Sequence, residues 1–312
     1  MAFNENSYWL KPPAASNTGR ALTFGGYSSQ NVIDYFNSGS AGNATDFGDL
    51  SNGGSEGEAQ ANGTYALFYL GRGSSTNNNI IEKVNISSTG NSADYGDAIE
   101  TTRDRTGSCS SSTISLNGGG YGNSGTDTID KKLFATDGNA TDFGNLTGAQ
   151  WRSEGGGSNG TKGILSVGGS NNSGNSQNMD TVVIASDGNA TDFGDTGYNS
   201  HTANGSSGSV KGFVFGGWTN GAYFNHIRVY NISSDGDTTD FGDLNIGRFL
   251  PGACADKLSA FECGGQSSTS NNVVQIDRWI QASAGNATDF GDLTSRSRTD
   301  GVSSACAAHG GI

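Results

Sequence analysis

The sequence is poor in the residues on which catalysis and polyanion binding usually depend. It has 3 histidines among 312 residues, only 15% of its residues are charged, and 30 acidic side chains accompany 17 basic ones. A net charge of −13 excludes the basic surface with which proteins bind nucleic acid. No apolar run approaches the roughly 18 residues of a membrane-spanning helix. We therefore expect no nucleic-acid partner and no insertion into a membrane.

Cysteine is also scarce, and the sequence lacks a recognisable export signal. The cysteines form no C-x-x-C motif and show no zinc-like spacing, so we expect buried thiols. Residues 1–6 have neither the basic nor the apolar region of a classical secretion signal. Release by cell lysis, as for a component of a virus particle, would fit this absence. The four cysteines are Cys109, Cys254, Cys263 and Cys306.

What the chain does have is glycine, together with aromatic residues at regular intervals. The 51 glycines and a hydrophobic fraction of 32% are close to the composition of low-complexity disorder. Proline, however, occurs only 3 times, and the 15 Phe, 10 Tyr and 4 Trp recur along the whole chain. Regularly spaced aromatic residues indicate a packed core.

One phrase, Asn-Ala-Thr-Asp-Phe-Gly-Asp-Leu at residues 43–50, returns five more times with small changes. Its first aspartate recurs every 48 to 50 residues, and an isoleucine or methionine lies 13 residues before each one. A fixed offset of this kind indicates a core position. The aspartates are Asp46, Asp94, Asp142, Asp192, Asp240 and Asp289, and the apolar residues are Ile33, Ile81, Ile129, Met179, Ile227 and Ile276.

Each repeat contains the pattern of four short strands. A glycine pair closes an apolar strand in five units, whereas the second unit reads Gly71-Arg72-Gly73. A period-2 strand, a tight turn, the strand that carries the phrase and a stretch of small residues follow. Four strands in a unit of about 50 residues are typical of kelch-type propeller blades. The small residues suit a strand that lines a crowded central channel.

The sequence thus predicts an all-β fold, a six-bladed kelch-like β-propeller with four-stranded blades. The first unit lacks its small-residue strand, and a spare one lies at residues 301–308. We expect this strand to pair with the N-terminal blade and close the ring, which removes exposed strand edges. The competing architecture, an open β-solenoid, would not need it. The expected parts are an N-terminal arm at 1–18 and a propeller at 19–312, with units at about 19–50, 51–98, 99–146, 147–195, 196–244 and 245–293 and a closing strand within 294–312.

The repeated aspartates allow two interpretations. The phrase places oxygen atoms at alternate positions, somewhat as calcium loops do. Its presence in all six units favours an architectural role, in which Asn, Asp and Thr side chains bond the backbone of the turn and the following aromatic ring packs between blades. We therefore expect no cofactor, with calcium as the alternative. The candidate calcium ligands are Asp46, Asp142, Asp192, Asp240 and Asp289.

No catalytic arrangement can be recognised in the sequence. His201, His226 and His309 occur in different contexts, and the few arginines are scattered along the chain. Glycoside hydrolysis needs only two carboxylates, so counting acids does not exclude it. We expect a protein that is not an enzyme.

Binding specificity is expected where the units differ, because a scaffold repeats and a site usually does not. The loop of the fifth unit is the most aromatic, and Trp218, Tyr223 and Asn225 could stack on a sugar and bond its hydroxyls. The alternative is that these rings cover the blade edge. Trp151, with Arg152, replaces the usual small residues before the inner strand of the fourth unit and is a second candidate.

The repeats resemble those of kelch-like structural proteins carried by marine phages, especially phages of cyanobacteria. The resemblance covers residues from Gly19 onward and rests on the Gly-Asn-Ala-Thr-Asp-Phe-Gly-Asp-Leu phrase, which is nearly intact from Asn43, Asn139, Asn189 and Asn286. It implies a virion structural protein of the tail-fibre, knob or capsid-decoration kind, exposed on the particle surface. It supplies no catalytic residues.

The expected partners are therefore other virion proteins or host surface polysaccharide. The alternatives are a glycan-cleaving depolymerase and a bacterial sugar-binding module. The missing secretion signal argues against the bacterial module.

Overall fold

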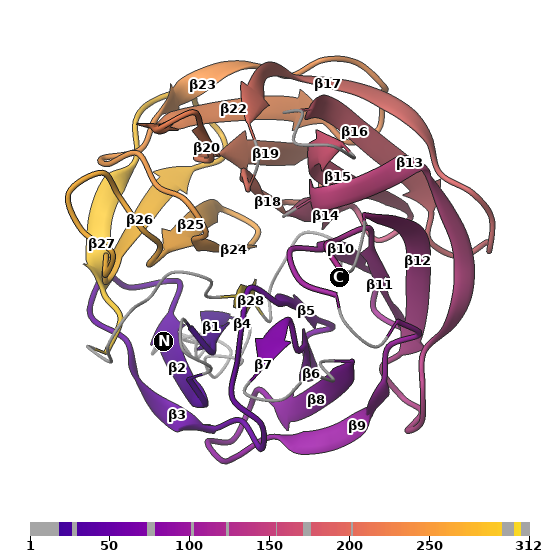
Figure 1. The fold of residues 1–312 in the computed structure, drawn as a ribbon. Coiled ribbons are helices and arrows are strands. Elements are labelled where there is room, and N and C mark those ends of the chain that lie inside the picture. Colours follow the sequence, from indigo (N-terminus) through magenta and orange to yellow (C-terminus); the bar gives the residue numbers. More distant parts are fainter. Residues whose placement is uncertain are drawn as a thin grey trace, which may run out of the picture.

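Four antiparallel strands repeat six times around a central axis, so the chain is the six-bladed β-propeller that the sequence predicts (Figure 1). The computed structural model describes residues 19–26, 30–73, 79–100, 103–122, 125–153, 155–170, 176–200, 202–294 and 303–306. Within these residues there is no α-helix. The expected N-terminal arm at 1–18 lies outside them.

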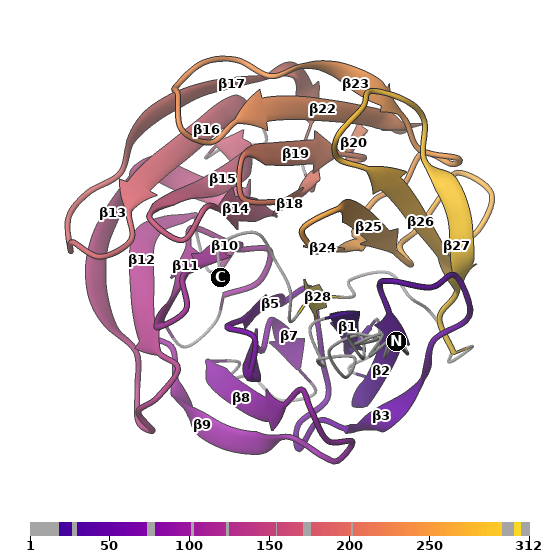
Figure 2. The ribbon, with the colours of Figure 1, turned by 180° about the vertical axis from the view of Figure 1, so that it is seen from behind.

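In each blade the four strands lie side by side in order from the axis to the rim, as the views from both ends show (Figures 1 and 2). Blade 1 comprises β28 (Ser303–Cys306), β1 (Arg20–Phe24), β2 (Val32–Asn37) and β3 (Thr45–Asp49); blade 2 comprises β5 (Glu58–Ala61), β6 (Tyr65–Tyr69), β8 (Ile80–Asn85) and β9 (Ala93–Asp97); blade 3 comprises β10 (Gly107–Ser110), β11 (Ile114–Gly118), β12 (Thr126–Leu133) and β13 (Thr141–Ser153). Blade 4 comprises β14 (Gly156–Ser158), β15 (Lys162–Ser170), β16 (Ser176–Val183) and β17 (Thr191–Ser200); blade 5 comprises β18 (Asn204–Ser207), β19 (Lys211–Phe215), β22 (His226–Asn231) and β23 (Thr239–Asp243); blade 6 comprises β24 (Gly252–Ala255), β25 (Ser259–Cys263), β26 (Gln275–Ile280) and β27 (Thr288–Asp292).

Two short strand pairs lie outside the four-stranded sheets of the blades. β4 (Gly54–Ser55) pairs with β7 (Arg72–Gly73), and β20 (Trp218–Thr219) pairs with β21 (Ala222–Tyr223). In addition, the C-terminal end of β13 pairs with β15 of the next blade. This pairing joins the sheets of blades 3 and 4. Both strand pairs lie beside the loops that follow the glycine pairs.

The ring is closed by the C-terminal strand, as expected. β28 is the innermost strand of blade 1 and pairs with β1, with Cys306 opposite Ala21 and Ser303 opposite Phe24. The Oγ of Ser303 also donates to the carbonyl of Gly57 at 2.5 Å, at the start of blade 2. The open solenoid is therefore the wrong alternative.

The hydrophobic core lies between consecutive blades. One cluster joins Phe24 and Phe47 of blade 1 to Phe68 of blade 2, and another joins Phe213 of blade 5 to Trp279 of blade 6. The aromatic ring of each repeated phrase is buried in this way. The four cysteines are buried free thiols, as predicted. The predicted core positions Ile33, Ile81, Ile129, Met179, Ile227 and Ile276 are all 0% exposed.

Small residues line the axis, which confirms the assignment of the inner strands. The six inner strands enclose a space of about 50 Å³. A water molecule needs about 10–15 Å³ of such space, so there is room for a few waters. A larger ligand is more readily accommodated at an end of the ring or on the rim. The wall is formed mainly by Ala, Ser, Gly and Cys residues, such as Ala59, Ser108, Gly157, Ser206, Cys254 and Ala305.

The repeated phrase joins neighbouring blades at the rim. The N–H groups of Gly42 and Ala44 donate to the carbonyls of Phe290 and Asp292, at 2.9 and 2.7 Å, and the Asn43 side chain accepts from the Asp292 N–H at 3.1 Å. The same three bonds recur at the other five junctions, with Asp237 replacing asparagine in blade 5. The sequence interpretation placed the asparagine bonds inside the turn. The structure shows that they cross to the preceding blade.

The glycine after each buried ring allows this close approach. A Cβ added to Gly144 would lie 2.4 Å from the carbonyl oxygen of Gly188 in the next blade, whereas a Cβ on Gly188 would meet nothing within 4 Å. The two glycines have similar φ values, 147° and 159°. Their comparison therefore separates crowding at the junction from backbone strain.

Gly144→Ala is expected to lower the free energy of unfolding by about 1–3 kcal/mol more than Gly188→Ala, because overpacking carries a cost of that size. Urea titration of the two variants measures the difference. Equal losses would contradict the close-packed junction.

Candidate functional site

The two ends of the propeller differ in the segments they present. One end carries tight turns, such as residues 111–113 and 159–161. The other end, which we call the crossover face, carries the loops after the glycine pairs and the segments that lead from each outer strand to the next inner strand. The described parts of these crossover segments are residues 50–57, 98–100, 103–106, 155, 202–203 and 244–251. Because the units differ most there, a specific site belongs on this face.

Buried acids accept hydrogen bonds from the backbone just after the repeated phrase, where the chain leaves the outer strand or continues along it. Glu82 accepts a hydrogen bond from the Ser51 N–H at 2.9 Å, and Asp180 accepts one from the Thr147 N–H at 3.0 Å. Asp277 holds Asn245 in the same way. Sequence reasoning missed this set, although an acid directly follows the core isoleucine or methionine in five units. The acids are Asp34, Glu82, Asp130, Asp180 and Asp277, and blade 5 has Arg228 instead.

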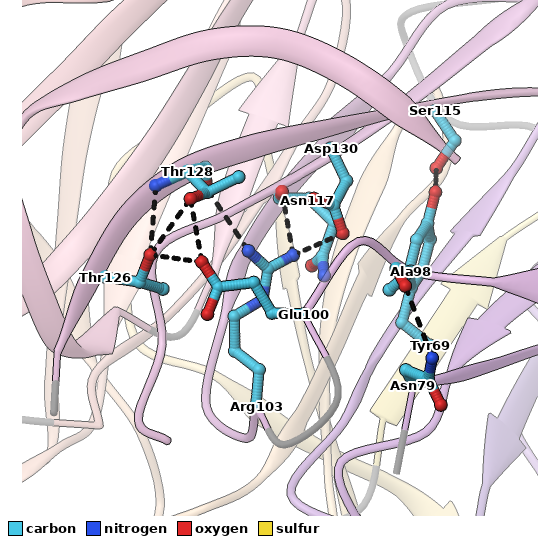
Figure 3. Close-up of polar contacts among 10 residues, drawn as sticks. All are labelled: Tyr69, Asn79, Ala98, Glu100, Arg103, Ser115, Asn117, Thr126, Thr128 and Asp130. Atoms are coloured by element: carbon cyan, nitrogen blue, oxygen red, sulfur yellow. Dashed lines mark hydrogen bonds and ion pairs between the residues drawn. The ribbon is translucent and has the colours of Figure 1, made fainter. Parts of the chain in front are cut away.

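In blade 3 an arginine strengthens this anchor. The Arg103 guanidinium donates to the Asp130 carboxylate at 2.6 Å and to the carbonyls of Thr128 and Asn117, at 3.2 and 3.3 Å (Figure 3). Burial raises the pKa of Asp130, and Arg103 opposes that rise. Glu100 accepts from the hydroxyls of Thr126 and Thr128, both at 2.8 Å. Arg103 is thus fixed, and Asp104 and Arg105 follow it directly.

Those two residues meet side chains of blade 2. Arg105 lies 2.6 Å from a carboxylate oxygen of Glu56, and its N–H donates to the Glu56 carbonyl at 2.8 Å. Arg72 Nε lies 3.1 Å from Asp104 and 3.8 Å from Glu56. We call these four residues, Glu56, Arg72, Asp104 and Arg105, the mouth cluster, because Glu56 and Arg105 each stand two residues before an inner strand of the channel.

The backbone at the mouth cluster is strained. Glu56 and Arg105 have φ values of 57° and 55°, in the left-handed region that side chains other than glycine disfavour. Such residues cost about 1–3 kcal/mol each and concentrate at functional sites. Thr202 and Leu250 have the same conformation at the same place in blades 5 and 6. The backbone conformation is therefore a general feature of the propeller at this position, whereas charged side chains occupy the position in blades 2 and 3.

An aromatic pair borders the mouth cluster. Tyr121 and Asp104 exchange backbone hydrogen bonds of 2.8 and 2.9 Å, and the Tyr121 ring packs on Trp151 with centroids 5.1 Å apart. Arg152, which follows Trp151, is close enough to Asp104 to lower its pKa. The candidate Trp151 thus lies beside a charged site. The arginines, scattered in the sequence, are gathered around Asp104 by the fold.

Burial sets the charge of this site. Desolvation raises the pKa of Asp104 to about 6; the three arginines, led by Arg105, oppose the rise, and Glu56 adds to it. Glu58, just below the mouth cluster, has its pKa raised by burial to about 8, although hydrogen bonds from Gly155 and Ser108 lower it. Glu58 is therefore mostly neutral at pH 7. The site then carries three arginines against two carboxylates.

The candidates of blade 5 lie elsewhere. Trp218 and Tyr223 are cross-strand partners in the β20–β21 hairpin, whose tip, Asn220-Gly221, has positive φ at both positions. Both rings are half-buried and pack against Phe249, with centroids 6.0 and 6.4 Å away.

Asn225 is exposed just after this hairpin. The neighbouring His226 is half-buried and packs against Tyr198 and Phe224, whereas His201 and His309 lie outside the described residues. Sugar binding by Trp218, Tyr223 and Asn225 stays a prediction.

The repeated aspartates lie apart from one another, because each stands on the outer strand of a different blade. All are exposed, and where their bonds are resolved, at Asp94, Asp192 and Asp289, the carboxylate accepts from the glycine N–H two residues on. Among the described residues, no three His, Cys, Asp or Glu side chains form a group that could hold a metal ion. Calcium binding stays a prediction.

No helix in the described part of the chain could span a membrane. No protein-family model matches the chain, and no curated protein matches it. The geometry of the crossover face therefore carries the functional argument.

Proposed function

We propose that the protein is a non-enzymatic attachment protein, exposed on the surface of a virus particle, that binds host surface glycan at the mouth cluster. One observation carries the proposal: β7, the crossover segment from blade 2 to blade 3 and the end of β13 bring guanidinium groups and an aromatic pair together at one point of an otherwise repetitive ring. Arginine forks and aromatic faces are the groups that recognise polar, ring-shaped ligands. The resemblance to marine-phage repeats supports the place on the particle and other virion proteins as further partners.

The ion pairs of the mouth cluster favour binding over catalysis. Glu56 and Asp104 are both held by guanidinium groups and buried. A glycosidase needs one carboxyl free to protonate the leaving oxygen and a second aimed at the sugar. Two carboxylates engaged with Arg72 and Arg105 suit a rigid recognition surface better.

Three measurements test this proposal. Mass spectrometry of purified particles should detect the protein, and its absence would refute the virion assignment. Immobilised host polysaccharide should retain the protein, and a chain that passes unretarded would refute glycan attachment. Incubation with the same polysaccharide should yield no new reducing ends. Their appearance would make the protein a depolymerase.

A further inference from the structure

We infer that the mouth cluster recognises a carboxylate-bearing sugar, so that the ligand is an acidic polysaccharide of the polyuronate kind bound through Arg72. This inference rests on the proposed function and names its ligand class. Arg72 is the residue that interrupts the second glycine pair, the single departure from that pattern among the six units.

Arg72 is placed to receive an anion. Its two ion pairs, to Asp104 and Glu56, both use Nε, and its side chain is 55% exposed. The outer edge of a guanidinium, formed by the two terminal nitrogens, matches a carboxylate in a bidentate pair. The protein thus holds the guanidinium at Nε. This fixes the direction of the two terminal nitrogens and reduces the entropy lost when a ligand binds them.

The local charge favours an anionic group despite the overall charge of −13. Arg72, Arg105 and Arg152 surround Asp104 and Glu56, and the raised pKa of Glu58 removes a third negative charge at neutral pH. Exposed charges farther away than the Debye length, about 8 Å at physiological salt, are largely screened. The repulsion from the rest of the chain therefore counts for less than the three nearby cations.

The neighbouring groups suit a sugar better than a simple anion. Tyr121 and Trp151 offer aromatic surface next to the charged groups. An aromatic face can stack on a sugar ring, which inorganic phosphate and sulfate do not offer.

Calorimetric titration with trigalacturonate and with its methyl ester, which is uncharged, tests the inference. Trigalacturonate should bind and the ester should bind at least 10-fold more weakly. Arg72→Gln should weaken trigalacturonate binding at least 10-fold, since the bidentate pair is lost. Asp104→Asn should strengthen it several-fold, because a competing carboxylate is removed; a damaged fold could not produce that gain. Lys257→Gln, which removes an exposed cation in the turn between β24 and β25, is the matched control and should leave binding unchanged.

Each contrary result has a distinct meaning. Equal affinity for acid and ester, or an Arg72→Gln variant that binds like the natural chain, overturns the carboxylate assignment. Retention of the protein by neutral polysaccharide alone overturns it too but leaves glycan attachment standing. If the natural chain binds neither trisaccharide nor any host polysaccharide, both proposals fail.

Discussion

A chain that ends before β28 is expected to melt at least about 10 °C below a chain that ends at Cys306. β28 forms four residue pairs with β1, and a ladder hydrogen bond contributes about 0.5–1.5 kcal/mol. All four of its residues are buried. For a domain of this size about 1 kcal/mol shifts the melting temperature by roughly 2–4 °C. Differential scanning calorimetry of the two chains measures the effect.

The exposed edge of β1 provides a second readout. An unpaired strand edge is a template for pairing with another chain, so the shortened protein is expected to form dimers or aggregates in gel filtration. A permuted chain, with residues 299–306 joined to Arg20 through a Gly-Ser-Gly turn, restores the strand without the original closure, because four residues then separate Cys306 from Ala21, as between the paired Ser110 and Ser115 of blade 3. We expect it to melt above the shortened chain. If shortened and full chains melt alike, β28 does not close the ring.

Arg248→Met is expected to be the most destabilising single substitution, with a loss of about 3–5 kcal/mol in the free energy of unfolding near pH 8. Arg248 is 0% exposed and lies 2.9 Å from Asp277 and 3.5 Å from Glu262. It also donates to the carbonyls of Gly264 and Gln275. Without it, two carboxyl groups remain buried with no cation between them. Urea unfolding measures the loss, and Lys257→Met, which removes an exposed cation, should change little.

The pH dependence of this variant follows from Glu262. Burial raises its pKa to about 8, although Arg248 lowers it, so the folded state binds a proton that the unfolded state releases near its ordinary pKa of 4.5. Such a group stabilises the fold below pH 4.5, and its contribution is lost as the pH rises toward 8.

Removing Arg248 raises the Glu262 pKa further, above its value of about 8 in the natural chain, so the two proteins lose stability in parallel up to about pH 7. The deficit of Arg248→Met should therefore stay nearly constant from about pH 5 to 7 and grow as the pH rises from about 7 to 9. The double variant Arg248→Met with Glu262→Gln should recover part of the loss at about pH 9. A deficit that does not grow above about pH 7 would contradict a buried charge as its cause.

The features that all units share were predictable because the same short sequence pattern recurs in each of the six units. The isoleucine or methionine 13 residues before the first aspartate of each phrase is buried in every blade, and the small-residue stretches are the inner strands. The role of the asparagines was only half predictable. Their turn-forming character is local, but the bond from the Asp49 N–H to Asn91 spans 42 residues, and nothing in the spacing indicates which blade supplies the donor.

The mouth cluster shows the opposite behaviour. Trp151 and the departure at Arg72 were visible as irregularities, but Glu56, Asp104 and Arg105 were not singled out. Glu56 belongs to the second unit and Asp104 and Arg105 belong to the third, and only the fold brings their crossover segments into contact. The raised pKa of Asp104 and Glu58 likewise depends on burial by neighbours that are distant in sequence.

The six-bladed propeller, its core positions and its closing strand followed from the sequence. Hydrophobic periodicity, glycine pairs and unit length are local properties of the sequence, and their repetition makes them recognisable. The tertiary structure alone decided that the repeated phrase bonds blade to blade and that arginines far apart in the chain surround Asp104. The physical reason is that ion pairing, desolvation and ring closure depend on distances in space, which a fixed spacing along the chain does not encode.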